Sequence, residues 1–185
     1  LAASLTLVIA LMLSAVGCSD SGNTPRDSYS QGPTLLYRGG PNAKPAEGEE
    51  ATIEGTANVS TSGDVALGVG NDEIGTSELD VPAESVNDED IGNAVHFIKM
   101  KVNKIGEVSA ELRPDGMTFK HPIMLTLSYK GADLTGIDEN NLVILYLNEE
   151  IGVWEVVEGS VVDTKKQRVS APLYHFSRYA VGNDE

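Results

Sequence analysis

Several residue types are scarce in this sequence of 185 residues, and each scarcity argues against certain classes of function. It has one cysteine, which in an exported protein would be left as an unpaired thiol unless it serves another purpose. Aromatic residues make up 5% of the chain, and no basic patch is interleaved with them, which argues against nucleic acid as a partner. The 13 Lys and Arg face 28 Asp and Glu, giving a net charge of −15. Anionic lipid headgroups would repel such a chain.

The signatures of common enzymes are also missing. There is no G-x-S-x-G elbow and no G-K-[ST] phosphate loop, and GVGNDEIG at residues 68–75 fails the dinucleotide fingerprint at its third glycine. His96, His121 and His175 lie on three different expected strands without metal-ligand spacing, which disfavours zinc. The acidic stretch 71–90 lacks the calcium-loop pattern, so weak calcium binding is a minor alternative to a solvated loop. We expect no cofactor and no small-molecule catalysis.

An apolar run stands at the beginning of the chain. Leu5 to Leu13 carries no charge; at about nine residues it is too short to span a bilayer and fits the apolar region of a signal peptide. The following Ala15-Val16-Gly17-Cys18 resembles the lipobox of bacterial lipoproteins. The resemblance implies acylation of the Cys18 thiol and cleavage before it. We therefore predict a signal peptide over residues 1–17 and a membrane anchor at Cys18, with an ordinary cleaved signal or a buried helix as the alternative.

Residues 18–51 separate this anchor from the rest of the chain. They are rich in Ser, Gly, Pro and Asn, and their only apolar cluster is Leu35-Leu36-Tyr37. Such a composition does not bury enough apolar surface to offset the entropy of ordering. We predict a flexible linker that holds a folded domain clear of the membrane.

From residue 52 onward the pattern is one of short β-type runs. Residues 98–103 and 123–129 alternate apolar and polar side chains, as strands with one wet face do. Residues 142–148 are apolar on both faces, which is typical of a central strand, and Pro172 indicates an edge or a bulge. No stretch after Cys18 keeps a helical period for three turns. We predict an all-β fold, an antiparallel β-sandwich of about seven to nine strands over residues 52–185.

Four motifs occur in a familiar order within this domain. They are Val81-Pro82-Ala83, then Pro114-Asp115-Gly116 followed by Thr118-Phe119 and Pro122, then Gly152 with Trp154, and last His175-Phe176-Ser177. In this order they resemble the ZU-five domain, the β-sandwich of zonula occludens protein, netrin receptors and ankyrins, which is also common in bacterial envelope lipoproteins. The resemblance covers about residues 62–185. Trp154 could serve as a stacking platform for a glycan, but a core position is the more usual one.

The last motif offers two interpretations. In some animal members of the family the chain cuts itself between Phe and Ser, which here would be Phe176 and Ser177. That chemistry needs a base and oxyanion donors. On one continuous strand His175 and Ser177 would share a face, so the imidazole could act as the base, while Phe176 and Tyr174 would face the core. The alternative is a plain last strand over residues 172–181.

We favour the plain strand. The leading interpretation is a lipid-anchored protein of the bacterial cell envelope, in the outer membrane if the cell is Gram-negative. It would present a β-sandwich that contacts an envelope protein through loops or an edge strand. Autoproteolysis at Phe176/Ser177 is the alternative function.

Overall fold

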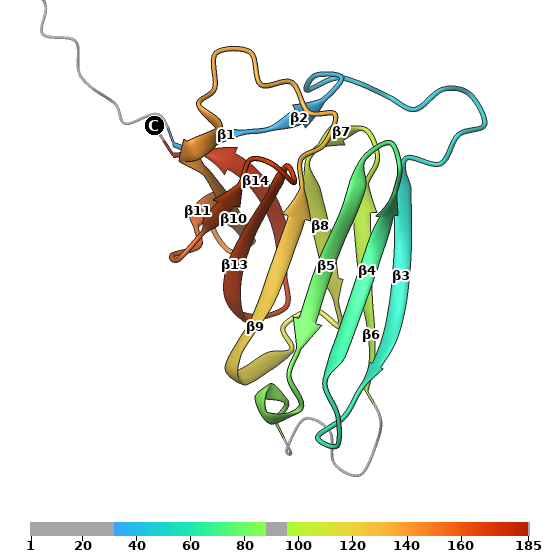
Figure 1. Ribbon diagram of the computed structural model, residues 1–185, viewed down its shortest axis with the longest axis vertical. Helices are drawn as coiled ribbons and strands as arrows, with labels where there is room; N and C mark the ends of the chain where they lie inside the picture. The colour runs from blue at the N-terminus through green and yellow to red at the C-terminus, as the bar shows by residue number, and fades with distance from the viewer. Residues whose placement is uncertain (1–31, 88–95, 185) are drawn as a thin grey trace, which may run out of the picture. The chain divides into compact units, whose positions relative to one another are not determined.

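Residues 32–87 and 96–184 are described by the computed structural model, His96 by its backbone alone. The predicted signal peptide and Cys18 lie outside the described residues. Within the described part of the chain, no helix is both long and apolar enough to cross a membrane. These residues form strands that are joined by turns and by two 3-10 helices, η1 (Ala83–Ser85) and η2 (Glu139–Asn141) (Figure 1).

The strands form two antiparallel sheets and a short ribbon. The seven-stranded sheet has the order β11 (Val153–Val156), β10 (Leu142–Asn148), β14 (Arg178–Asn183), β8 (Ser109–Arg113), β6 (His96–Asn103) and β3 (Thr52–Val59), with β1 (Thr34–Leu35) added to the end of β14. The five-stranded sheet has the order β12 (Val161–Asp163), β13 (Arg168–His175), β9 (Thr118–Ser128), β5 (Gly75–Val81) and β4 (Val65–Asn71). The ribbon pairs β2 (Tyr37–Arg38) with β7 (Gly106–Glu107). The predicted all-β antiparallel sandwich is confirmed.

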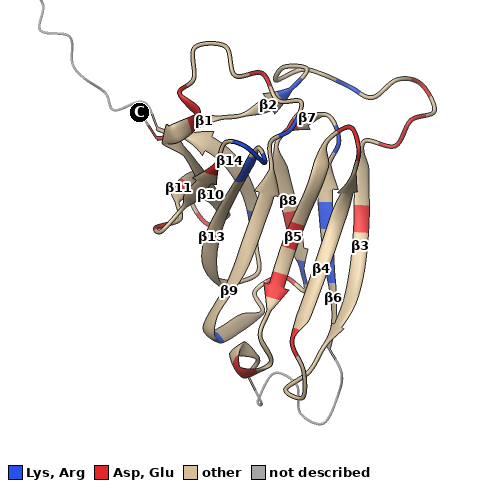
Figure 2. Cartoon of the chain, viewed as in Figure 1, with Lys and Arg blue, Asp and Glu red and all other residues tan. Residues whose placement is uncertain are grey.

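The apolar core lies between the two sheets, on the faces that alternation predicted. Ile98, Met100 and Val102 of β6 are each at most 2% exposed, and the apolar residues of β9 that alternate with polar ones are buried in the same cluster. The intervening Lys99 and Lys101 are partly exposed beside Glu54 of the neighbouring β3 (Figure 2). Because side chains in a strand alternate between faces, each strand contributes one apolar row, and burying a Leu or Ile contributes roughly 1.5–3 kcal/mol.

Two edge strands, one from each sheet, approach each other closely at Gly55. A Cβ atom at Gly55 of β3 would lie 2.4 Å from Cγ2 of Val69 on β4, so only glycine fits. The hairpin from β3 to β4 thereby carries the chain from one sheet to the other, and β4 forms the edge of the five-stranded sheet.

The structure differs from the predicted linker at residues 34–38. Thr34 and Leu35 pair with Asn183 and Gly182 of β14, and Leu36 is only 1% exposed. The Leu36 N–H donates to the Val181 carbonyl at 2.9 Å, and its carbonyl accepts from the Val108 N–H at 2.9 Å. When a short apolar segment adds to an existing sheet, its hydrogen bonds and burial can offset the entropy lost on ordering. Composition alone does not reveal this. The expectation of a flexible linker is therefore wrong for these residues.

Candidate functional site

The His-Phe-Ser segment forms a corner between the two sheets. Strand β13 ends at His175 in the five-stranded sheet, and β14 begins at Arg178 in the seven-stranded sheet. The prediction of one strand over residues 172–181 is therefore wrong. The register of β13 against β9 shifts between Leu173 and His175, and such an irregularity bends a strand out of its ladder.

Phe176 fills the inside of this corner. Its side chain is 1% exposed, and its ring centroid lies 5.1 Å from that of Phe119 at an interplanar angle of 59°. Its backbone N–H donates to the Met117 carbonyl at 2.7 Å. The predicted core position of Phe176 is confirmed, whereas Tyr174 is 59% exposed and does not face the core. The two residues would share a face only on a continuous strand, and the corner ends that alternation.

His175 is turned toward Tyr179 of β14. Its Nδ1 lies 3.0 Å from the Tyr179 hydroxyl, which in turn donates to the His175 carbonyl at 2.7 Å. A phenol has one proton, so once this proton is given to the carbonyl, Nδ1 must carry its own hydrogen and donate to the phenol oxygen. Burial raises the pKa of Tyr179, which keeps the phenol neutral. Nδ1 is thus a donor, which leaves Nε2 as the ring nitrogen with a free lone pair.

Ser177 makes no hydrogen bond with His175 within the described ranges. Its hydroxyl donates to the Leu147 carbonyl at 3.4 Å, a long and weak contact. One part of a cleavage site is present, because the Gly116 N–H donates to the Phe176 carbonyl at 3.2 Å, where an oxyanion would develop. Within the described residues no hydrogen bond joins the Ser177 hydroxyl to a base, and the corner acts as a packing and crossing element.

A set of ion pairs lies next to the corner. Glu111 accepts from Arg113 at 2.5 Å and lies 3.7 Å from Lys101, and Arg113 also pairs with Asp115 at 3.3 Å. The hydrogen bond from Arg113 lowers the pKa of Glu111. Glu111, Arg113 and Asp115 line a hollow of about 180 Å³ together with Ser177. The charges of these side chains are paired with one another, so little of their charge remains to bind a ligand.

Trp154 is not a core residue, contrary to the more usual position expected for it. It lies on β11 at the edge of the seven-stranded sheet, opposite Leu147, and is partly exposed. The Arg178 guanidinium lies 5.7 Å from its ring centroid, a cation–π contact. A ring that is already covered by a guanidinium is a poorer platform for a sugar.

The three histidines do not converge where their side chains are described. His121 is exposed on β9, and His175 ends β13. In residues 32–87 and 96–184, no group of three or more His, Cys, Asp or Glu could hold a metal ion. Part of the acidic stretch 71–90 falls on residues that the structure does not describe.

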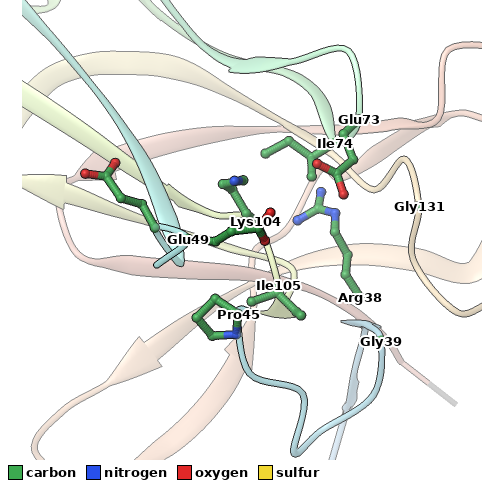
Figure 3. Close-up of a pocket in the computed structure, with 10 residues that line it drawn as sticks. Arg38, Gly39, Pro45, Glu49, Glu73, Ile74, Lys104, Ile105 and Gly131 are labelled. Atoms are coloured by element: carbon green, nitrogen blue, oxygen red, sulfur yellow. The ribbon is translucent and has the colours of Figure 1, made fainter. Parts of the chain in front are cut away.

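A second candidate site surrounds Arg38, in the segment that composition assigned to a linker (Figure 3). Arg38 is 5% exposed and donates to three backbone carbonyls, those of Lys130 at 2.9 Å, Asn103 at 2.8 Å and Ser128 at 2.5 Å. Burial lowers the pKa of Arg38 to about 10, and the nearby Glu73 opposes this shift, so the guanidinium remains charged at neutral pH. Sequence reasoning missed this residue because its partners are distant in the chain.

Comparison with family models, with curated proteins and with solved structures finds no match to this chain. The fold and the geometry of these two sites therefore carry the functional argument.

Proposed function

We propose that this chain is a lipid-anchored protein of the bacterial cell envelope, whose ZU-five-like sandwich serves as an interaction or structural module and performs no small-molecule catalysis. The anchor rests on the apolar run before Cys18 and on the likeness of Ala15-Val16-Gly17-Cys18 to a lipobox. The domain assignment rests on the order of its four motifs in a chain that folds as a sandwich.

The observation that carries this proposal is the way in which the His-Phe-Ser corner uses its reactive groups. His175 is engaged with Tyr179, Phe176 is buried against Phe119, and the Ser177 hydroxyl faces the Leu147 carbonyl. A serine hydroxyl without a base is a weak nucleophile. The most reactive triplet of the sequence thus serves the fold, which supports a module that acts by contact.

The intact mass of the purified full chain, measured after denaturation beside Ser177→Ala, tests this point. We expect the same mass for both proteins, less whatever the signal peptidase removes. If the wild type alone loses the nine residues from Ser177 to Glu185, the chain processes itself and the alternative function is correct. Denaturation is essential, because a cut β14 would remain paired with β10 and β8.

An apolar outer surface on the five-stranded sheet supports the interaction role. Val161 is 67% exposed, Tyr174 59% and Met124 40%, on the neighbouring strands β12, β13 and β9. Exposed apolar side chains gathered on one face are a common mark of a protein contact.

A photo-crosslinking residue placed at Tyr174 in intact cells is expected to give one discrete adduct. The same residue placed at Lys99, on the outer face of the other sheet, is the control. Equal and diffuse labelling from the two positions would contradict a contact on this face.

A further inference from the structure

The Arg38 pocket has a floor that holds a positive charge in a fixed orientation. A guanidinium has five N–H donors, and Arg38 uses three of them on the carbonyls of Lys130, Asn103 and Ser128. One N–H on Nη1 and one on Nη2 remain. Because the three carbonyls fix the plane of the group, these two donors are held in place before any ligand arrives.

The rim carries charges of both signs, and one of them, Glu73, lies near enough to Arg38 to interact with its charge. Glu73 follows the end of β4, Lys104 follows β6, and Glu49 lies on the segment that leads to β3 (Figure 3). None of the ion pairs found within 4.0 Å in the described part of the chain includes Arg38, Glu73, Glu49 or Lys104. Some charges elsewhere do form such pairs, as Glu111 and Arg113 do at 2.5 Å.

Apolar side chains lie among these charges. Pro45, Ile105 and the buried Ile74 line the pocket together with Gly131, and its volume is about 300 Å³. This volume lies at the lower end of the range for small-molecule sites, and the lining is more polar than is usual for them. The pocket thus suits a small ligand that has one apolar part and carries both charges.

We propose that this pocket binds a free amino acid with an apolar side chain. Its carboxylate lies between the two remaining Arg38 donors and the Lys104 ammonium, since Arg and Lys are the usual partners of a carboxylate. Its ammonium is held by the carboxylate of Glu73, and its side chain packs on Pro45 and Ile105. The pocket shares no residue with the lipobox or with the His-Phe-Ser corner, so this inference stands or fails independently of the proposed function.

The test uses L-leucine as the probe, with N-acetyl-L-leucine and L-leucine amide as partners that each lack one charge. Amide chemical shifts of the isotope-labelled full chain are followed during each titration. Leucine is expected to shift the amides of Lys104, Ile105 and Gly131 saturably. Each single-charge analogue is expected to bind about tenfold more weakly, a factor that corresponds to roughly 1.4 kcal/mol.

Rim variants connect each charge of the ligand to its partner while Arg38 is left intact. Lys104→Gln is expected to weaken leucine about tenfold and to reduce its advantage over leucine amide, with Arg38 still holding the carboxylate; Glu73→Gln is expected to remove its advantage over N-acetyl-leucine. Lys120→Gln and Glu84→Gln, which alter exposed residues outside the pocket, are matched controls and are expected to change nothing. Absence of saturable shifts up to the solubility limit of leucine would overturn the proposal, and so would equal binding of either analogue.

Discussion

Arg38 holds several segments of the chain together at one end of the sandwich, and the stability of that end depends on it. Its guanidinium ties the carbonyls of Asn103, at the end of β6, and of Ser128 and Lys130, at the end of β9, to the ribbon. Arg38→Lys keeps the charge but cannot span three carbonyls with a compact ammonium, and it leaves buried acceptors unsatisfied. We expect the free energy of unfolding, measured by urea denaturation, to fall by about 3 kcal/mol. Arg178→Lys, at a partly exposed site, is expected to cost less than about 1 kcal/mol; equal losses for the two variants would contradict this role.

Glu111 gives the stability a dependence on pH. The hydrogen bond from Arg113 lowers the pKa of Glu111 in the folded state below its usual 4.5. A group whose pKa is depressed on folding stabilises the protein above its unfolded pKa, and this contribution is lost as the pH falls through the folded value. Glu111→Gln is therefore expected to be less stable than the wild type at pH 7, with the difference shrinking as the solution is acidified below about pH 4.5. Urea titrations across this range measure it, and a difference that stays constant with pH would refute the assignment.

Strand β1 and the residue that follows it show how a short element is held by a sheet. Leu36 is 1% exposed and bonded to the carbonyl of Val181, while Leu35, on the pairing strand itself, is only partly buried. Removing a buried leucine leaves a cavity and costs about 2–5 kcal/mol. Leu36→Ala is expected to lower the free energy of unfolding by this amount, as measured by urea denaturation. Leu35→Ala should cost clearly less; if the two variants are equal, the segment is not part of the core.

The strands were predictable where a local pattern specifies them. In β6 and β9, alternation gave the apolar face that meets the opposite sheet, because a period of two determines which side chains point to it. In β9 the polar Thr126 and Ser128 of the other face are buried as well, which alternation did not predict. The corner at Phe176 was not predictable. It depends on a register shift against β9 and on contacts of Phe176 with Gly116 and Met117, some 60 residues earlier in the chain, and no periodicity records such contacts.

At the scale of the molecule, the Arg38 pocket could not be predicted from the sequence, because it too depends on contacts between distant parts of the chain. The carbonyls that hold Arg38 lie 65, 90 and 92 residues away in sequence. Composition placed Arg38 in a polar linker, and only the closure of the sheets brings these carbonyls to one point. The net charge could be read from the sequence. Which charged side chains form ion pairs on one face, and which have no ion-pair partner within 4.0 Å around the pocket, could not.

The position of the sandwich relative to the membrane follows from where its first strand begins. If Cys18 is acylated, residues 19–33 are all that separate the lipid from Thr34, and fifteen residues span at most about 50 Å when fully extended. Thr34 must then lie within this distance of the membrane surface. Cys18→Ser is expected to abolish incorporation of labelled palmitate and to move the protein from the detergent phase to the aqueous phase on phase separation, with Ser177→Ala as the unaffected control. Labelled lipid on the Cys18→Ser protein would place the anchor at another residue. An unlabelled wild type would mean that the chain is not acylated and that this limit on distance does not apply.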